Sequence, residues 1–371
     1  MTRLRVATGI DLPLAPSAGS PILCSDVYGR LRDRVDSTFF CLPPTAEEWD
    51  HGFSRIAVCQ TPKKPYGAEF SAYVEGLTQE VRRELSNSPY DLIHAQHLGY
   101  GLSLAFCRAG SGLPIISIAH GTDVIDSLTC DQAADALREI VESSTAVVVP
   151  NEAMREYVVS IAGAQPDGRI VTLPWGIPLE GVGAHAAPRD DGEPLRLLHA
   201  GRLEPVKSPV TAVESLAHMA SPHTLTIVGG GSELESLMRR AAALRLLDRV
   251  TFKPFMSRQE LWREFSQHDM FLFTTTGVEA FGLVTVEAQA HGLPVAYGDV
   301  DAMGETLGLG GIPYPAGDAR ALARVVDQLA RDSTTRRKVS AIAIENSARF
   351  SVDLTSGQLF HLSTQVAQGS F

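Results

Sequence analysis

The sequence predicts an α/β protein made of two consecutive doubly wound domains with parallel sheets. Short apolar runs alternate with longer stretches in which apolar residues recur every three or four positions, which is typical of βα units. The alternation stops at 174–194, a segment with four prolines and several glycines, and then restarts. The 371 residues are enough for two domains of ordinary size.

The first domain is expected over 1–176. Its predicted strands are short runs rich in Val, Ile, Leu and Ala, at 4–8, 56–60, 91–96, 114–120 and 146–150. Nearly continuous apolar runs of this kind indicate parallel strands that are buried on both faces. Helices are predicted over 69–85 and 131–144, where apolar residues lie three and four apart.

The second domain is expected over 177–351, after a linker whose prolines exclude both a helix and a central strand. Its predicted strands lie at 195–201, 224–231, 250–255, 270–276 and 294–299, with helices between them. The segment 350–366 predicts a final helix. We expect the end of the chain, about 352–371, to pack back on the first domain.

Composition excludes several classes of function. The formal net charge of −11 argues against nucleic acid or an anionic membrane as a partner. The five cysteines show no C-x-x-C spacing, which indicates neither a disulfide framework nor a zinc site. No window approaches 18 uncharged apolar residues, so we expect a cytoplasmic protein without integral membrane association. The sequence does not indicate an oligomeric state.

A pair of glutamates marks the strongest candidate site. At 274–299 a predicted strand ends in a loop that opens a helix, with Glu279 in the loop and Glu287 inside the helix. Carboxylates accept hydrogen bonds from hydroxyls, and amides at a helix N-terminus favour an anion. The combination suits a sugar joined to a diphosphate. Two glutamates by themselves are more often surface charges.

Two basic residues follow the first strand of the second domain. Arg202 and Lys207 lie in the loop that precedes the helix at 208–219. Together a guanidinium fork and an ammonium can neutralise a diphosphate leaving group without a metal ion. Either residue alone would more often be an exposed surface charge.

These motifs occur in the order and spacing of the retaining glycosyltransferases of family 4, which the chain resembles over most of 90–350. The residues that carry the resemblance are Gly201-Arg202-Leu203 with Lys207, the segment 228–237, Glu279-Ala-Phe-Gly-Leu with Glu287, and Gly292-Leu-Pro-Val. The resemblance implies the GT-B fold, in which two Rossmann-like domains face a central cleft, with an N-terminal acceptor-binding domain and a C-terminal donor-binding domain.

The resemblance also implies a role for each matching residue. Arg202 and Lys207 would bind the diphosphate, Glu279 the sugar hydroxyls, and Glu287 the ribose. Backbone groups would complete the donor site, from Phe255 near the base, from Ala280, Phe281, Gly282 and Leu283 around the sugar and phosphate, and from Gly19 and Ser20 in the other domain.

In the N-terminal half, His120-Gly-Thr-Asp123 matches the histidine motif of the family. His120 would contact the donor sugar near the reacting carbon, while Asp123 would orient the acceptor or a loop. The segment 91–97 resembles a strand whose end faces the acceptor, which assigns His97 an acceptor role. An isolated histidine at a strand end is more often structural. Because the whole motif matches the family, a functional role is the preferred interpretation here.

Some features depart from the family or invite a different interpretation. Trp175-Gly176, Asp301-Ala302 and Val352 replace residues that are usual at those places. The glycines at 229–231 lack the spacing of a dinucleotide site, and Ser232 with Glu235 predicts a capping box there. Asp299 and Asp301 imitate a metal-binding Asp-x-Asp motif, but the basic residues already supply positive charge. We therefore expect that no metal is required.

The sequence thus predicts a retaining, metal-independent transferase without a further cofactor. It would move a hexose or N-acetylhexosamine, of the glucose or GlcNAc type, from a nucleoside diphosphate, with UDP favoured over GDP or ADP. The acceptor would be a hydroxyl of a small polar molecule, such as an aminocyclitol or another natural-product intermediate. The alternatives are a UDP-sugar epimerase, which needs no acceptor, and a non-catalytic nucleotide-sugar-binding protein.

Overall fold

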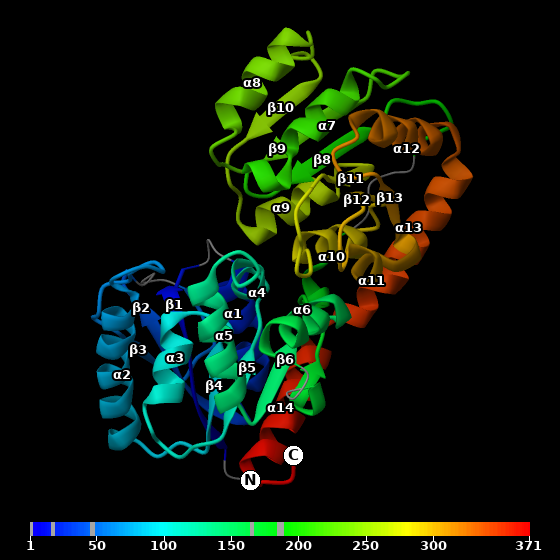
Figure 1. Cartoon of the computed structure of the whole chain (residues 1–371). Coiled ribbons are helices and arrows are strands. Elements are labelled where there is room, and N and C mark those ends of the chain that lie inside the picture. Colours follow the sequence, from blue (N-terminus) through cyan, green and yellow to red (C-terminus); the bar gives the residue numbers. More distant parts are fainter. Residues whose placement is uncertain (1–2, 16–18, 45–48, 164–166, 184–188) are drawn as a thin grey trace. The chain divides into compact units, whose positions relative to one another are not determined.

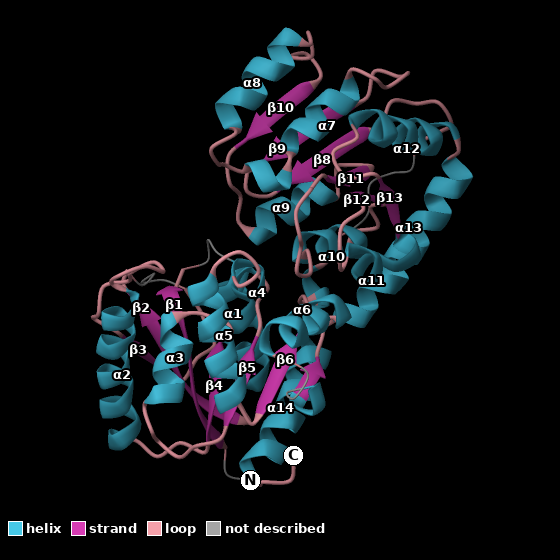
Figure 2. Ribbon diagram, viewed as in Figure 1, coloured by secondary structure: helices cyan, strands magenta, loops and turns pink. Residues whose placement is uncertain are grey.

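In the computed structural model the chain forms two compact units, one made of Met1–Gly176 with Val352–Phe371 and the other of Ile177–Ser351 (Figure 1). The structure describes residues 3–15, 19–44, 49–163, 167–183 and 189–371. Each unit contains one parallel sheet with helices packed around it (Figure 2). The predicted α/β class with two doubly wound domains is confirmed.

The first unit contains a seven-stranded sheet in the order β3-β2-β1-β4-β5-β6-β7. Its strands are β1 (Leu4–Pro13), β2 (Val35–Leu42), β3 (Arg55–Val58), β4 (Leu92–Gln96), β5 (Ile115–Ile118), β6 (Ala146–Val149) and β7 (Ile170–Thr172). Its helices are α1 (Gly19–Leu31), α2 (Phe70–Asn87), α3 (Gly101–Arg108), α4 (Thr122–Asp126), α5 (Asp131–Ser143), α6 (Glu152–Ala162) and α14 (Val352–Ala367). Strand order reverses between β1 and β4, which is where ligands bind in open α/β sheets.

Helix α14 completes the first unit from the far end of the chain. It packs against α1, and Ser356 Oγ donates a hydrogen bond to the carbonyl of Val27 on that helix. Beneath it, buried His94 on β4 bonds Tyr28 Oη through Nδ1 at 2.6 Å and Ser363 Oγ through Nε2 at 2.9 Å. This chain of side chains joins α1, the sheet and α14.

Burial of His94 predicts acid-sensitive folding. Desolvation lowers the pKa of His94 to about 3, whereas an unfolded histidine titrates near 6.5. Between these values the unfolded chain binds a proton that the folded chain does not, so the free energy of unfolding falls as pH decreases below 6.5. The contribution of His94 is about 1.4 kcal/mol per pH unit. Urea unfolding of His94→Gln between pH 4.5 and 6 should show a slope smaller by about one proton; equal slopes would contradict this account.

The second unit contains a six-stranded sheet in the order β10-β9-β8-β11-β12-β13. Its strands are β8 (Arg196–Ala200), β9 (Thr224–Val228), β10 (Val250–Lys253), β11 (Met270–Phe273), β12 (Val295–Gly298) and β13 (Gly311–Tyr314). Its helices are α7 (Pro209–Leu216), α8 (Leu234–Ala243), α9 (Arg258–Phe265), α10 (Leu283–Ala290), α11 (Met303–Leu307), α12 (Ala319–Arg331) and α13 (Ser333–Ser347). Here the order reverses between β8 and β11. Apolar clusters cover both faces of the sheet.

Several local predictions differ from the structure. Strands β2, β7 and β13 were not predicted. In β2, Asp36, Ser37 and Thr38 interrupt the apolar pattern, yet Ser37 is buried and exchanges hydrogen bonds with Ser54. The capping box of Ser232 with Glu235 is wrong, because Ser232 bonds the carboxylate of Glu204 instead. Within the described ranges, no helix has the length and apolar character needed to cross a membrane.

Candidate functional site

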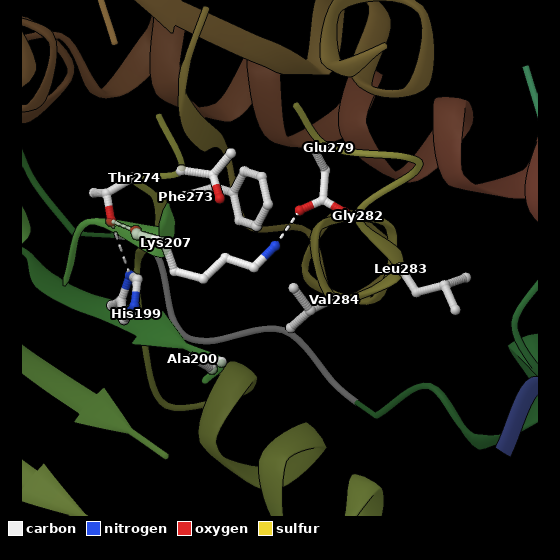
Figure 3. A pocket seen from close by; sticks show the side chains of 11 residues that line it. His199, Ala200, Lys207, Phe273, Thr274, Glu279, Gly282, Leu283 and Val284 are labelled. Atoms are coloured by element: carbon white, nitrogen blue, oxygen red, sulfur yellow. Dashed lines mark hydrogen bonds and ion pairs between the residues drawn. The ribbon is translucent and has the colours of Figure 1, made fainter. Parts of the chain in front are cut away.

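A cavity of about 160 Å³ lies in the second unit at the point where strand order reverses (Figure 3). The ends of β8 and β11 and the start of α10 supply most of its wall. Its lining residues are His199, Ala200, Gly201, Lys207, Phe273, Thr274, Thr275, Glu279, Gly282, Leu283 and Val284. The carboxyl ends of two adjacent parallel strands therefore meet a helix N-terminus, which is the arrangement that binds phosphates in many α/β proteins.

Lys207 and Glu279 form an ion pair at this cavity, and Figure 3 shows the ammonium directed at the carboxylate. Both side chains are mostly buried. The carbonyl of Lys207 accepts a hydrogen bond from Thr274 Oγ1 at 2.9 Å, which ties the loop after β8 to β11. The ammonium also lies 5.8 Å from the centre of the Phe273 ring. The cavity thus holds a cation and an anion that an anionic, hydroxyl-bearing ligand would separate.

The start of α10 is shaped by Gly282. Its φ is +73°, and a Cβ there would lie 3.0 Å from Met303 Cε and 3.2 Å from Thr285 Oγ1. Both conditions favour glycine. The preceding Phe281 is buried edge-on against Phe350, and Ala280 is also buried. The side chains of Ala280 and Phe281 are therefore buried, and a ligand would contact mainly their backbone. The first backbone amides of a helix have no hydrogen-bond acceptor inside that helix.

Glu287 lies elsewhere on α10 and does not line this cavity. Its buried carboxylate pairs with Arg258 at the start of α9, with Nε and Oε1 3.0 Å apart. The two glutamates of the predicted pair therefore have different cationic partners. The sequence spacing did not predict this contact between Arg258 and Glu287.

Arg202 and Phe255 are both exposed and lie outside the cavity wall. Arg202 follows β8 directly after Gly201, and Phe255 follows β10 with 62% of its surface accessible. Exposed residues at the carboxyl ends of strands are available to a ligand larger than the cavity. A nucleotide is such a ligand.

His199 is a cavity residue that the sequence analysis missed. It lies on β8, and its Nδ1 donates to the carbonyl of Leu272 at 3.0 Å. Burial lowers the pKa of His199 to about 4, so the ring is neutral at physiological pH. Its Nε2 is buried and has no hydrogen-bond partner among the residues that the structure describes. The sequence feature that could have identified His199 is its position two residues before the Gly201-Arg202 motif.

In the first unit, His120 follows β5 and bonds Gln96 at the end of β4. His120 Nε2 lies 2.7 Å from Gln96 Oε1, and because an amide oxygen only accepts, Nε2 carries the hydrogen. Gln96 in turn donates to Thr8 Oγ1 on β1 at 3.1 Å. Desolvation lowers the pKa of His120 to about 3. His120 is therefore a neutral imidazole fixed in one tautomer, and it brings no positive charge to the site.

Asp123 is buried and holds two loops together. Its carboxylate accepts hydrogen bonds from the backbone amides of Leu98, His120 and Gly121. Burial raises the pKa of Asp123 to about 6 despite these bonds. These contacts support the loop-orienting half of its predicted role.

His97 and Ser20 lie beside this loop. Ser20 Oγ, in the first turn of α1, is 3.2 Å from His97 Nε2. The His97 ring packs between Tyr100 at 4.5 Å and His120 at 4.4 Å, with its φ at +74°. Gly19 begins α1 with open space beside it. The structure therefore brings Ser20, His97 and His120 together.

The described residues contain no group of three or more His, Cys, Asp or Glu side chains arranged to hold a metal ion. Asp299 and Asp301 accordingly belong to no such group in the described part of the chain. The positive charge at the cavity comes from Lys207, with exposed Arg202 nearby in sequence.

Comparisons with known proteins agree with this architecture. The family model for group 1 glycosyl transferases matches residues 184–346, and the model for glycosyltransferase family 4 matches 22–180. D-inositol 3-phosphate glycosyltransferase of Mycobacterium sp. (strain KMS) is 28% identical over 307 residues, which cover 76% of this chain and 68% of the relative. The Mycobacterium leprae (strain TN) protein of the same name is 28% identical over 317 residues, covering 78% and 72%.

Solved structures share the fold over nearly the whole chain. Sucrose-phosphate synthase from Thermosynechococcus elongatus superposes with a TM-score of 0.85 at 19% identity, covering 99% of this chain and 100% of that one. Anabaena HepE in complex with UDP and glucose superposes with a TM-score of 0.81 at 18% identity, covering 98% and 100%. The predicted GT-B fold class, with two Rossmann-like domains, is confirmed.

Proposed function

Since this chain belongs to family 4 of the glycosyltransferases, we propose that it transfers a hexose or N-acetylhexosamine from UDP to a hydroxyl of a small polar acceptor. The observation that carries the proposal is the Lys207–Glu279 ion pair beside the N-terminus of α10. It offers a cation to a diphosphate and a carboxylate to sugar hydroxyls within one cavity.

Donor binding would exchange the partners of this ion pair. The diphosphate would take Lys207, with Arg202 and the first amides of α10 adding positive charge. Glu279 would then be released to accept hydrogen bonds from the sugar. Glu287 would bind the ribose, and backbone near Phe255 the base. UDP is favoured because HepE, which has the same fold, was solved with UDP, with UDP-glucose and with UDP and glucose.

We propose that transfer retains the configuration at the anomeric carbon. The bond from that carbon to the phosphate oxygen breaks, and the acceptor oxygen bonds to the carbon on the same face. The acceptor proton passes to the departing phosphate oxygen. Lys207 and Arg202 stabilise the charge on the diphosphate as it leaves, which lowers the barrier because this charge grows in the transition state. NMR of the first-formed product distinguishes retention from inversion, and an inverted product would contradict this route.

The acceptor would meet the first unit near Ser20, His97 and His120. His120 is neutral, so it would act there through hydrogen bonds and not through charge. Nearby, the partly exposed ammonium of Lys63 is 3.6 Å from the carboxylate of Asp11, which is buried. A polyhydroxylated ring suits hydrogen-bonding groups of this kind. The curated relatives named for D-inositol 3-phosphate support a cyclitol, of which an aminocyclitol is a variant.

Thermal unfolding tests the donor site directly. We expect UDP and a UDP-sugar to raise the melting temperature in EDTA, whereas NAD should not. Ligand at ~100 times its Kd adds about 2.7 kcal/mol to the free energy of unfolding. Glu287→Ala should reduce the shift, because the ribose loses an acceptor.

The alternative functions predict different results in thermal unfolding and in turnover assays with the same nucleotides. A shift that requires magnesium would implicate Asp299 and Asp301 and contradict the metal-independent site. Turnover of UDP-sugar without an acceptor to an isomeric UDP-sugar would indicate an epimerase. Binding with neither transfer nor hydrolysis across a panel of cyclitol and sugar acceptors would indicate a non-catalytic binding protein.

A further inference from the structure

Glu287, the other glutamate of the predicted pair, forms an ion pair with Arg258 in the second unit. Arg258 is the first residue of α9, and its Nε lies 3.0 Å from Glu287 Oε1 on α10. The side chains of Arg258 and Glu287 are 21% and 9% exposed. A carboxylate this deeply buried is stable as an anion only with a cationic or hydrogen-bonding partner.

The helix that carries Arg258 has a fixed start. Ser257 caps α9 in a capping box with Glu260, in which Ser257 N donates to Glu260 Oε2 at 2.8 Å. This box satisfies two amides at the helix N-terminus and sets the direction from which the Arg258 side chain departs.

The guanidinium is also supported by an aromatic ring. It lies 5.9 Å from the centre of the Trp262 ring, one turn along the same helix. Trp262 is itself held in place, because Gly181 leaves no room beside it: a Cβ on Gly181 would lie 2.5 Å from Trp262 Cζ3. The centre of the His291 ring lies 5.2 Å from the centre of the Trp262 ring.

His291 closes a loop of contacts back to Glu287. Its Nδ1 donates to the carbonyl of Glu287 at 2.8 Å, and its Nε2 accepts from the amide of Gly183 at 3.3 Å. The backbone of Glu287 and its carboxylate are therefore held from two directions, by His291 and by Arg258. A carboxylate held by Arg258 on a backbone that His291 also holds is preorganised for a ligand.

The Lys207–Glu279 ion pair differs from the Arg258–Glu287 ion pair in its cation and in its place in the fold. Lys207 lies on the loop after β8, carries a flexible ammonium and lines the cavity, so a diphosphate can take Glu279's place beside it. Arg258 lies at a capped helix start and does not line that cavity. Its planar guanidinium, supported by Trp262, suits a pair that stays intact when the donor binds.

We propose that Arg258 is a positioning residue that keeps Glu287 ionised and correctly oriented for the ribose hydroxyls, and that it thereby makes the enzyme selective for a ribonucleotide donor. This inference rests on the proposed function, because it takes Glu287 as the ribose ligand. Arg258 acts through Glu287 and needs no contact with the sugar being transferred.

The test compares UDP with 2′,3′-dideoxy-UDP by calorimetry, in the wild type, Arg258→Met and Arg258→Lys. Arg263→Met is the matched control, because Arg263 is an exposed arginine on the same helix and lines, with Arg258, a second cavity of about 490 Å³. Hydrogen bonds to a charged group correspond to ~10–100-fold in affinity, and we expect the wild type and Arg263→Met to prefer UDP by this factor.

Arg258→Met should weaken UDP binding ~10-fold or more while leaving dideoxy-UDP binding unchanged, so that the preference collapses. Arg258→Lys keeps the charge and should retain part of the preference.

Equal effects of Arg258→Met on both ligands, or none on either, would overturn the inference while leaving the donor site standing. If Arg258→Met does not fold, Arg258→Lys decides by the same comparison. A preference of this variant for UDP over 2′,3′-dideoxy-UDP as large as that of the wild type would leave the geometry of the guanidinium without a role. A wild type that binds neither nucleotide would instead refute the proposed function, and the inference with it.

Discussion

Lys207→Met is expected to lower kcat for sugar transfer by ~10²–10³-fold, the usual effect of removing one group that stabilises transition-state charge. Methionine keeps much of the length of the lysine side chain and removes its charge. The variant also leaves the mostly buried Glu279 without its ion-pair partner, so the free energy of unfolding should fall. Initial rates over a range of donor concentrations, with urea unfolding of the same samples, measure both effects.

Lys64→Met is the matched control for this substitution. Lys64 is an exposed lysine of the first unit that pairs with Glu69 at 3.0 Å, and exposed pairs contribute little. We expect its kcat and stability to match the wild type. A rise in the donor KM of Lys207→Met with kcat unchanged would show that Lys207 binds ground state and transition state equally, contrary to the proposed role.

Gly229→Ala is expected to have the largest effect on the fold. Gly229 follows β9 with φ at +137°, and a Cβ there would lie 2.0 Å from the carbonyl oxygen of Gly201. Because the obstacle is backbone, relief requires movement of the loop that carries Arg202. Backbone strain and overpacking of this kind destabilise by about 2–5 kcal/mol in total. Urea unfolding should show this loss, and transfer activity should fall because Arg202 is displaced.

The neighbouring Gly230 supplies the control. A Cβ on Gly230 meets no atom within 4 Å, and its φ lies outside the left-handed region. Gly230→Ala should therefore leave stability within about 1 kcal/mol of the wild type. Comparable losses in the two variants would mean that the glycine-rich segment needs general flexibility, and that the approach to Gly201 is not what demands glycine.

Much of the fold was predictable because its elements carry strong local signals. Buried parallel strands such as β6 and β11 are uninterrupted apolar runs, and helices such as α5 have clear 3.6-residue periodicity. Strand β2 was not predicted, because its polar Ser37 is buried by contact with Ser54, 17 residues away in the sequence. Such a contact produces no periodic pattern of apolar residues. The capping box at Ser232 failed for a related reason, since Glu204 is a long-range competitor for the same hydroxyl.

The candidate site also contains residues that the sequence predicted and residues that it did not. Lys207 and Glu279 stood out because family motifs fix their places, and the structure brings them into contact. No role was predicted for Arg258, Gln96 or His199, although Gln96 and His199 lie in or beside segments that resemble the family. Their importance comes from what they touch, and contacts between different strands and helices cannot be obtained from spacing along one chain. The polar groups that orient site residues are therefore harder to identify from sequence than the site residues themselves.

The placement of α14 has a consequence for how the protein is made. The first unit needs α14 for the contacts to His94 and to Val27 of α1, and α14 is synthesised after the whole of the second unit. The second unit is continuous in sequence and has all its strands once synthesis has passed β13. The first unit, whose strands are translated first, therefore lacks the helix that packs on α1 until the second unit and α14 have been synthesised. Premature termination after α13 would yield a finished second unit joined to an unfinished first one.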